Sequence, residues 1–189
     1  MTDIQLFALF GIAVILLLFY GVSLVPNLSG LPWRPTASAR IRKALEMAQV
    51  QPGEILVDLG SGDGRVLLQA VREFQVRAVG IEISPLHCLL SWLLVRKHRL
   101  EHQISIQQAD FYRADLSQVD VVFAYMTSKQ VARLRPHLEK QLKPGARVVT
   151  ISFDIDGWEP QLVDRDQLIF LYQMPPQAGN LGTYLAKTL

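Results

Sequence analysis

The chain has 189 residues, of which 50% are hydrophobic and 19% are charged, and its mean hydropathy is +0.21. These values exclude a disordered or fibrous protein, and the single cysteine, Cys88, excludes an internal disulfide framework. A formal net charge of +2 is too small for the field of the whole molecule to attract a polyanion, so any basic surface must be local.

The first predicted element is an apolar run over residues 6–25 that contains no charged side chain. At about 1.5 Å per helical residue the run reaches roughly 30 Å, the hydrocarbon thickness of a bilayer, which predicts a transmembrane helix. A cleaved signal peptide is the rival interpretation, but it needs a basic region before the run, where only Asp3 is charged. We therefore expect a single-pass anchor over residues 1–25.

Lysine and arginine residues predict the orientation of this anchor. None precedes the run, whereas Arg34, Arg40, Arg42 and Lys43 follow it. Because positive residues favour the cytoplasmic side, we expect the N-terminus outside and the remaining chain in the cytoplasm, as in a protein of the bacterial inner membrane. Residues 26–35 are rich in Pro, Gly and Ser, which predicts a linker, and residues 36–189 form the predicted domain.

Helices and strands alternate through most of this domain. Helices are predicted from Thr36 or Ser38 to before Pro52 and over residues 65–74, 84–100 and 129–142, and strands over 54–59, 77–83, 104–108, 119–125 and 146–153. This alternation predicts an α/β fold with a doubly wound parallel sheet covered on both faces. The runs 167–172 and 181–187 are interpreted as a terminal antiparallel pair of strands.

The strongest chemical signal is VDLGSGDGR at residues 57–65, where a strand is followed by closely spaced glycines and then a helix. Glycines at such a turn let the backbone approach a ligand, and open α/β sheets bind ligands at this edge. The residues of interest are Asp58, Gly60, Ser61, Gly62 and Gly64. A dinucleotide fingerprint would need Gly or Ala where Arg65 stands, and no Gly-Lys-Ser/Thr follows to make a phosphate-binding loop.

Two further acids follow neighbouring predicted strands. Glu82 ends the second strand, roughly 20 residues after the glycine turn, where a carboxylate can accept hydrogen bonds from both ribose hydroxyls. Asp110 follows the third strand and can accept from the exocyclic amine of an adenine, with Phe111 or Ile83 as the apolar surface for the ring. A strand-end acid or a turn-capping acid is the structural alternative at each position.

VDLGSGDGR, GIEIS (80–84) and QADF (108–111) together resemble the class I S-adenosylmethionine-dependent methyltransferases, and the resemblance covers residues 36 to about 187. It implies a Rossmann-like seven-stranded sheet of order 3-2-1-4-5-7-6 with the last strand antiparallel. It also implies that S-adenosylmethionine is the cofactor, with its methionine end held by Asp58 and the 60–64 turn, its ribose by Glu82 and its adenine amine by Asp110.

A narrower resemblance is to the membrane-anchored protein-lysine methyltransferases whose mitochondrial members modify the adenine nucleotide translocase and the c subunit of ATP synthase. It is carried by the apolar run, Pro35-Thr36, VVFAYMTSKQ (121–130), LKPGARVV (142–149) and the residues Phe153, Trp158 and Pro160. After the fourth strand, the motif of that family resembles Gly-Val-Pro, whereas this chain has Ala-Tyr-Met-Thr at 124–127. The same residues lack the Asp/Asn-Pro-Pro-Tyr pattern of adenine-N6 methyltransferases, so nucleic acid is not an expected partner.

Tyr125, at the end of the fourth strand, is the candidate catalytic residue, because its hydroxyl or ring face can orient a lysine amine; a core tyrosine is the alternative. No metal is expected, since His98 and His102 lack a third ligand. The expected partners are a membrane-protein substrate and lipid around the anchor. A lipid or quinone acceptor, and a non-catalytic assembly factor that keeps the cofactor pocket, are the other interpretations.

Overall fold

The computed structural model describes residues 5, 7, 9–14, 16 and 36–188. The predicted linker and much of the predicted anchor lie outside these residues. In the part of the chain that is described, no helix combines the length and the apolar character needed to cross a membrane.

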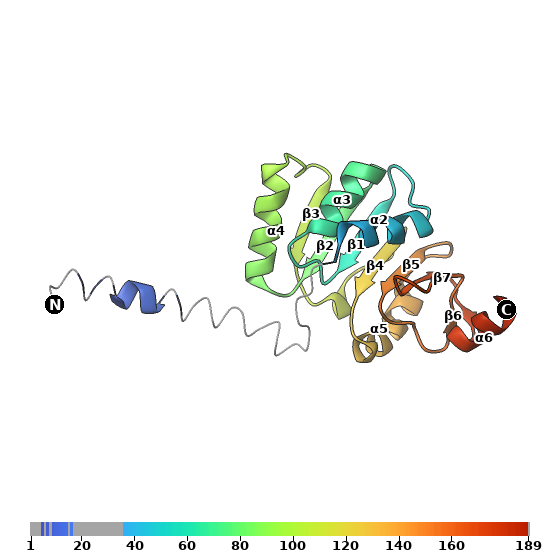
Figure 1. Cartoon of the computed structure of the whole chain (residues 1–189). Coiled ribbons are helices and arrows are strands. Elements are labelled where there is room, and N and C mark those ends of the chain that lie inside the picture. Colours follow the sequence, from blue (N-terminus) through green and yellow to red (C-terminus); the bar gives the residue numbers. More distant parts are fainter. Residues whose placement is uncertain (1–4, 6, 8, 15, 17–35, 189) are drawn as a thin grey trace.

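The centre of the domain is a seven-stranded sheet of order β3-β2-β1-β4-β5-β8-β7 (Figure 1). Its strands are β1 (Ile55–Leu59), β2 (Arg77–Glu82), β3 (Ile104–Gln108), β4 (Val121–Tyr125), β5 (Arg147–Ile151), β7 (Leu162–Asp164) and β8 (Ile169–Gln173). The first five are parallel, and β8 runs antiparallel to both of its neighbours. Because β7 and β8 are the sixth and seventh strands of this sheet along the chain, the predicted order 3-2-1-4-5-7-6 is confirmed.

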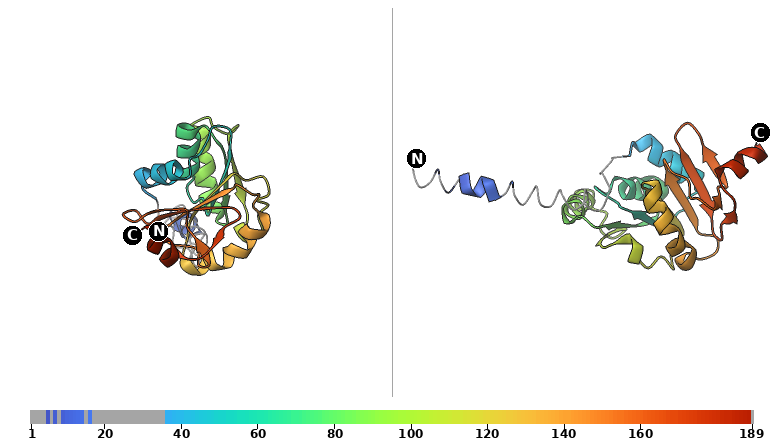
Figure 2. Two further views of the ribbon diagram at one scale, coloured as in Figure 1. Left: turned by 90° about the vertical axis from the view of Figure 1, so that its right-hand side faces the viewer. Right: turned by 90° about the horizontal axis from the view of Figure 1, so that it is seen from below.

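Helices cover both faces of the sheet (Figure 2). The helical elements are α2 (Ser38–Met47), α3 (Arg65–Phe74), α4 (Pro85–Lys97), the 3₁₀ turn η1 (Phe111–Arg113), α5 (Ser128–Gln141) and α6 (Leu181–Thr188). One hydrophobic core lies under α2 and α3 and includes Val95 of α4, and the other lies under α5. Alternating strand residues supply the two cores, as expected for a parallel sheet buried on both faces. In Figure 1, α4 stands at one end of the domain beside β3, and β7 and α6 lie at the other.

The prediction of a terminal strand over residues 181–187 is wrong, because this segment is the helix α6. The Asn180 side chain accepts a hydrogen bond from the Thr183 amide at 3.0 Å, and the Thr183 hydroxyl oxygen accepts one from the Asn180 amide at 2.7 Å. This reciprocal pair satisfies amides of the first helical turn and so favours a helix over a strand. In the sheet, β8 pairs antiparallel with both β5 and β7, while β6 (Trp158–Glu159) and β9 (Gln177–Ala178) form a separate short pair.

Candidate active site

The predicted site residues lie where β1, β2, β3 and β4 end. Leu59, the last residue of β1, lies opposite Ile81 of β2 and Ala124 of β4. The glycine turn that follows therefore has the end of β2 on one side and the end of β4 on the other. This is the edge at which open α/β sheets bind ligands.

Left-handed backbone conformations shape the glycine turn. Gly60, Gly62 and Gly64 have φ values of 82°, 54° and 80°, which side chains rarely adopt. The amides of Gly60 and Ser61 donate to the Ile81 carbonyl at 2.8 and 3.2 Å, and this pins the turn to the end of β2. A Cβ atom placed on Gly60 would meet nothing within 4 Å, so the backbone there borders open space that a ligand can fill.

Gly64 has a different role, because it lies against another helix. A Cβ atom at this position would come within 2.1 Å of the Ser91 hydroxyl of α4. The absence of a side chain at Gly64 therefore lets α4 pack against the beginning of α3. The last glycine of the motif serves packing, whereas Gly60 borders the open side of the turn.

The buried Glu82 carboxylate connects the turn to α4. One of its oxygens accepts from the Gly62 amide at 2.9 Å, and the other accepts from the Ser84 amide at 2.9 Å. Ser84 is the N-cap of α4, and its side chain accepts a hydrogen bond from the His87 amide. Pro85 occupies the first turn of the helix, as the sequence predicts. Each carboxylate oxygen can accept more than one hydrogen bond, so Glu82 can also receive ribose hydroxyls.

Asp58 is a second buried acid at this edge. Burial raises the pKa of its carboxyl to about 8, with further contributions from the nearby charges of Glu82 and Asp63. Among the described residues, no basic side chain forms an ion pair with Asp58 or Glu82. Two buried acids without a basic partner suit a ligand that brings its own positive charge and hydroxyl donors, as S-adenosylmethionine does.

Of the residues predicted to face the adenine, Asp110 and Phe111 follow β3 and Ile83 directly follows β2. Asp110 accepts from the Tyr112 amide at 3.1 Å and so caps η1, which is the structural alternative considered for it. Phe111 is buried in the core beside Tyr112, with ring centroids 4.4 Å apart, whereas Ile83 is exposed. Ile83 is therefore the accessible apolar surface of the two predicted candidates.

Tyr125 ends β4 at the edge that carries the glycine turn. Its ring packs against the core under α2, and the Arg40 guanidinium lies 5.6 Å from the ring centroid. Arg40 also donates to the Gln167 carbonyl at 2.8 Å and to the Ser152 hydroxyl at 3.0 Å. Sequence reasoning missed this role of Arg40, since nothing local links α2 to residues that follow β5 and precede β8.

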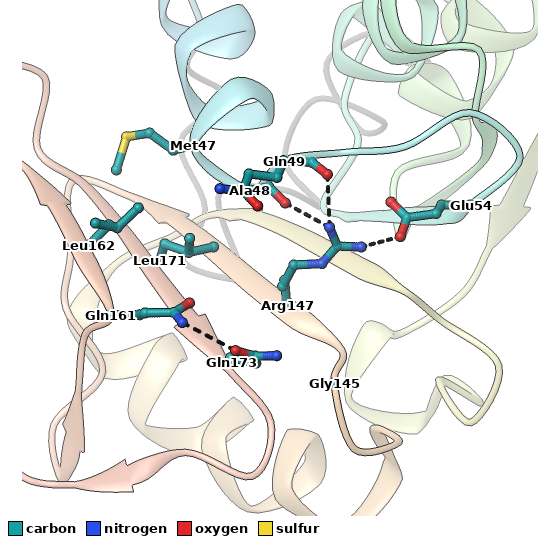
Figure 3. A pocket seen from close by; sticks show the side chains of 10 residues that line it. All are labelled: Met47, Ala48, Gln49, Glu54, Gly145, Arg147, Gln161, Leu162, Leu171 and Gln173. Carbon is teal, nitrogen blue, oxygen red and sulfur yellow. Dashed lines mark hydrogen bonds and ion pairs between the residues drawn. The ribbon is translucent and has the colours of Figure 1, made fainter.

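The opposite edge of the sheet carries a cleft of about 470 Å³ between α2 and the strand ends (Figure 3). Arg147 crosses it, donating to the Ala48 and Gln49 carbonyls at 2.8 and 3.0 Å and pairing with Glu54. The charged groups of this cleft, Arg147 and Glu54, pair with each other, whereas Asp58 and Glu82 have no basic partner among the described residues. In the described chain no three His, Cys, Asp or Glu side chains are grouped to hold a metal ion.

This sheet order, a glycine turn after β1 and a buried acid ending β2 define a class I S-adenosylmethionine-dependent methyltransferase. A solved RNA methyltransferase from Salinibacter ruber, in complex with S-adenosyl-L-homocysteine, superposes with a TM-score of 0.74 at 33% identity. The match covers 77% of this chain and 97% of that one. S-adenosyl-L-homocysteine is what remains of S-adenosylmethionine after methyl transfer. The similar structure therefore contains the demethylated form of the cofactor that this class of enzyme uses.

The family model described as the ANTKMT methyltransferase domain matches residues 58–162, and the chain belongs to this family. A protein-lysine N-methyltransferase of Saccharolobus islandicus is 37% identical over 143 residues, which is 75% of this chain and 87% of that protein. The Xenopus laevis lysine N-methyltransferase that is named for the c subunit of ATP synthase is 29% identical, covering 69% of this chain and 57% of that protein. The Mus musculus adenine nucleotide translocase lysine N-methyltransferase is also 29% identical, covering 78% of this chain and 64% of that protein.

Proposed function

We propose that the chain transfers methyl groups from S-adenosylmethionine to lysine side chains of a membrane-associated protein. The observation that carries the cofactor part is the pair of buried acids, Asp58 and Glu82, beside a glycine turn that borders open space. The relatives named above as lysine N-methyltransferases support lysine as the acceptor. The apolar run at residues 6–25 supports a membrane location.

In this proposal the site residues bind and orient the cofactor, which supplies a methyl group on a positively charged sulfur. Asp58 and the turn residues Gly60, Ser61 and Gly62 hold the methionine end, while Gly64 lets α4 pack against the beginning of α3. Glu82 accepts from the ribose hydroxyls, and Asp110 accepts from the adenine amine. Ile83 lies against the adenine ring, while Phe111 supports the backbone of η1 from the core.

Tyr125 is proposed to orient the acceptor amine. A free lysine has a pKa of about 10.4, so the amine must lose its proton before it can attack, and an apolar site that excludes water lowers that pKa. The Tyr125 hydroxyl can accept from the neutral amine and point its lone pair toward the methyl group. Aligning the reactants in this way is the main requirement of a displacement with a good leaving group.

Replacement of Tyr125 tests this role. We expect Tyr125→Phe, which keeps the ring beside Arg40 but removes the hydroxyl, to lower methyl transfer by about tenfold, the effect of about one hydrogen bond, without changing cofactor affinity. Initial rates with radiolabelled cofactor and cofactor titrations measure the two effects. Unchanged turnover would show that Tyr125 is only a packing residue.

The membrane location is proposed from the N-terminal apolar run. An anchor over residues 1–25, with the domain on the cytoplasmic side of a bacterial inner membrane, would raise the concentration of the enzyme near acceptors in that membrane. A protease-protection measurement on sealed inner-membrane vesicles tests the orientation. We expect the protease to digest the domain when it has access to the cytoplasmic face of the membrane, and not when it has access only to the outer face. Protection of the domain from a protease at the cytoplasmic face would contradict this orientation.

The acceptor is tested by incubating membranes from a deletion strain with the full chain and radiolabelled S-adenosylmethionine. We expect label in a protein band, on lysine by mass spectrometry, and none with Asp58→Ala or Glu82→Ala. Label only in the organic extract would indicate a lipid or quinone acceptor, and label in RNA would indicate the activity named for the Salinibacter ruber relative. Cofactor binding without any label would favour a non-catalytic assembly factor.

A further inference from the structure

Helix α4 exposes four large apolar side chains on the surface of the domain. The side chains of Leu89, Trp92 and Leu93 are 52%, 43% and 49% exposed, and Leu90 is 44% exposed. The buried positions of the helix are Ser91 and Val95. A surface helix of a globular domain ordinarily has the opposite arrangement, with its leucines against the core. We call the four exposed residues the outer face of α4.

Basic residues continue the outer face toward the end of the helix. Arg96 and Lys97 lie in the last turn, Arg99 follows, and all three are exposed. The Arg96 guanidinium lies 5.1 Å from the ring centroid of Trp92. No acidic residue occurs within Pro85–Lys97, so this end of the surface is positively charged.

Other basic residues near the start of the domain are already engaged. Arg40 binds the Gln167 carbonyl, Arg42 pairs with Glu73 at 2.7 Å, and Lys43 lies 3.9 Å from Asp164. Arg42 and Lys43 therefore face acids of the domain and Arg40 is held by hydrogen bonds, whereas Arg96, Lys97 and Arg99 at the end of α4 are exposed.

We propose that the outer face of α4 docks on an anionic lipid bilayer. Leucines beside an interfacial tryptophan and a cluster of Lys and Arg are the composition of helices that lie in the headgroup region of membranes. The helix lies at one end of the domain beside β3, and its outer face is exposed there (Figures 1 and 2). This inference rests on the proposed function for bringing the chain to a membrane.

The preceding chain is long enough for this contact. The apolar run ends at residue 25, and residues 26–35 connect it to the described domain. A stretch of that length spans at most about 35 Å when extended, while a helix as long as α4 measures roughly 20 Å. A run inserted in the bilayer thus leaves α4 within reach of the same surface.

Docking through α4 also specifies the class of acceptor. The helix begins at Ser84, whose amide binds the Glu82 carboxylate, so its first turn adjoins the cofactor edge of the sheet. With α4 on the bilayer, that edge lies close to the headgroups. The enzyme then reaches lysines at the cytoplasmic surface of membrane proteins, in loops or at helix ends, rather than lysines that protrude far into the cytoplasm.

Fluorescence of Trp92 tests the contact in the full chain. In a Trp33→Phe background, Trp92 and the buried Trp158 are the remaining tryptophans, and a companion Trp33→Phe/Trp92→Phe protein gives the Trp158 signal for subtraction. The probe is vesicles of phosphatidylglycerol and brominated phosphatidylcholine. We expect strong quenching of Trp92, reduced at least twofold by Leu89→Gln/Leu93→Gln and by Arg96→Gln/Lys97→Gln.

Leu162→Gln/Leu168→Gln is the matched control, because these leucines are exposed to 43% and 48% but belong to the β7–β8 end of the domain. Quenching should be unchanged in this variant. Unquenched Trp92 in a chain that still floats with the vesicles would overturn the proposal. Shielding of Trp92 in the absence of lipid, if it increased with protein concentration, would also overturn the proposal. It would show that a second copy of the chain covers α4.

Lysine methylation measured on the same vesicles separates this inference from the proposed function. Methylation of a reconstituted membrane protein without Trp92 quenching would overturn the docking surface alone. Trp92 quenching without lysine methylation would overturn the lysine acceptor alone.

Discussion

Acidic residues at the amino ends of the parallel strands have basic partners, whereas the buried acids at the carboxyl ends have none in the part of the chain that the structure describes. At the amino ends, Glu54 pairs with Arg147, and Asp120 binds Lys143 at 2.7 Å and the Ile55 amide at 2.8 Å. At the carboxyl ends, Asp58 and Glu82 are buried without a basic partner among the described residues. Acids that stabilise the fold have basic partners within the domain, whereas the acids proposed to bind the cofactor have none in the described chain.

The pKa directions follow the same division. Burial raises the pKa of Asp58 to about 8, and no neighbouring cation opposes it. Burial also pushes the pKa of Asp120 upward, but the Ile55 amide and the Lys143 ammonium outweigh it, so the net pKa lies below the ordinary value. The protein therefore carries a cost for Asp58 that a positively charged ligand can remove.

The largest expected effect is the loss of cofactor affinity in Glu82→Gln. The side-chain NH2 group of the introduced glutamine is a donor, so it could not accept from one of the two backbone amides that the Glu82 carboxylate now binds. The negatively charged acceptor proposed for the ribose hydroxyls would also be lost. We expect affinity to fall about 100-fold, equivalent to about 3 kcal/mol, by calorimetric titration of S-adenosyl-L-homocysteine.

The control at the amino ends is Glu54→Gln, which weakens the pair with Arg147. It should lower the free energy of unfolding by no more than about 1 kcal/mol and leave cofactor affinity unchanged. Equal losses of affinity in the two variants would contradict the division between the two ends of the sheet.

A smaller effect concerns Asp58 and pH. In the ligand-free protein the folded state keeps a proton on Asp58 up to about pH 8, while the unfolded chain releases it near pH 4. Asp58 therefore makes the free energy of unfolding decrease as the pH rises through this window, by about 1 kcal/mol per pH unit between pH 6 and pH 7.5. Urea unfolding should show that Asp58→Asn loses this slope.

Asp120→Asn is the matched variant for this measurement. The pKa of Asp120 is lowered, so its contribution to stability is present at neutral pH and is lost only as the pH falls through the acid range. We expect Asp120→Asn to keep the wild-type slope between pH 6 and pH 7.5. An identical slope in Asp58→Asn would mean that Asp58 is ionised in the folded protein.

The smallest effect compares Gly60 with Gly145, which have φ values of 82° and 84° and open space where a Cβ would stand. Alanine at either position should lower the free energy of unfolding by a similar amount, about 1 kcal/mol, because both backbones are left-handed. Only Gly60→Ala should also weaken cofactor binding, since its methyl group would enter the proposed site. Thermal unfolding and cofactor titration measure the two effects, and weaker binding in Gly145→Ala would contradict this assignment.

The features that the sequence predicted are those that short patterns of neighbouring residues or the family resemblance indicate. The glycine turn, the beginning of α4 at Ser84-Pro85 and the strand order follow from short patterns and from the resemblance to a known family. The tail was predicted wrongly because the Asn180–Thr183 cap outweighed a run that also suits a strand.

The remaining features depend on packing between distant segments. The contacts of Arg40 with Ser152 and Gln167 join residues more than a hundred positions apart, and no local pattern signals them. The α4 sequence is apolar on all sides, so periodicity could not show that its leucines face outward.

One carboxylate holds both the glycine turn and the first turn of α4, and this makes their opening a shared event. The amides of Gly62 and Ser84 belong to different elements, yet each is bound by Glu82. Neither amide can exchange its hydrogen with solvent unless that hydrogen bond breaks, and displacement of the Glu82 side chain breaks both. In hydrogen-exchange measurements the two amides should therefore be protected together, and a ligand that immobilises Glu82 should slow both by the same factor.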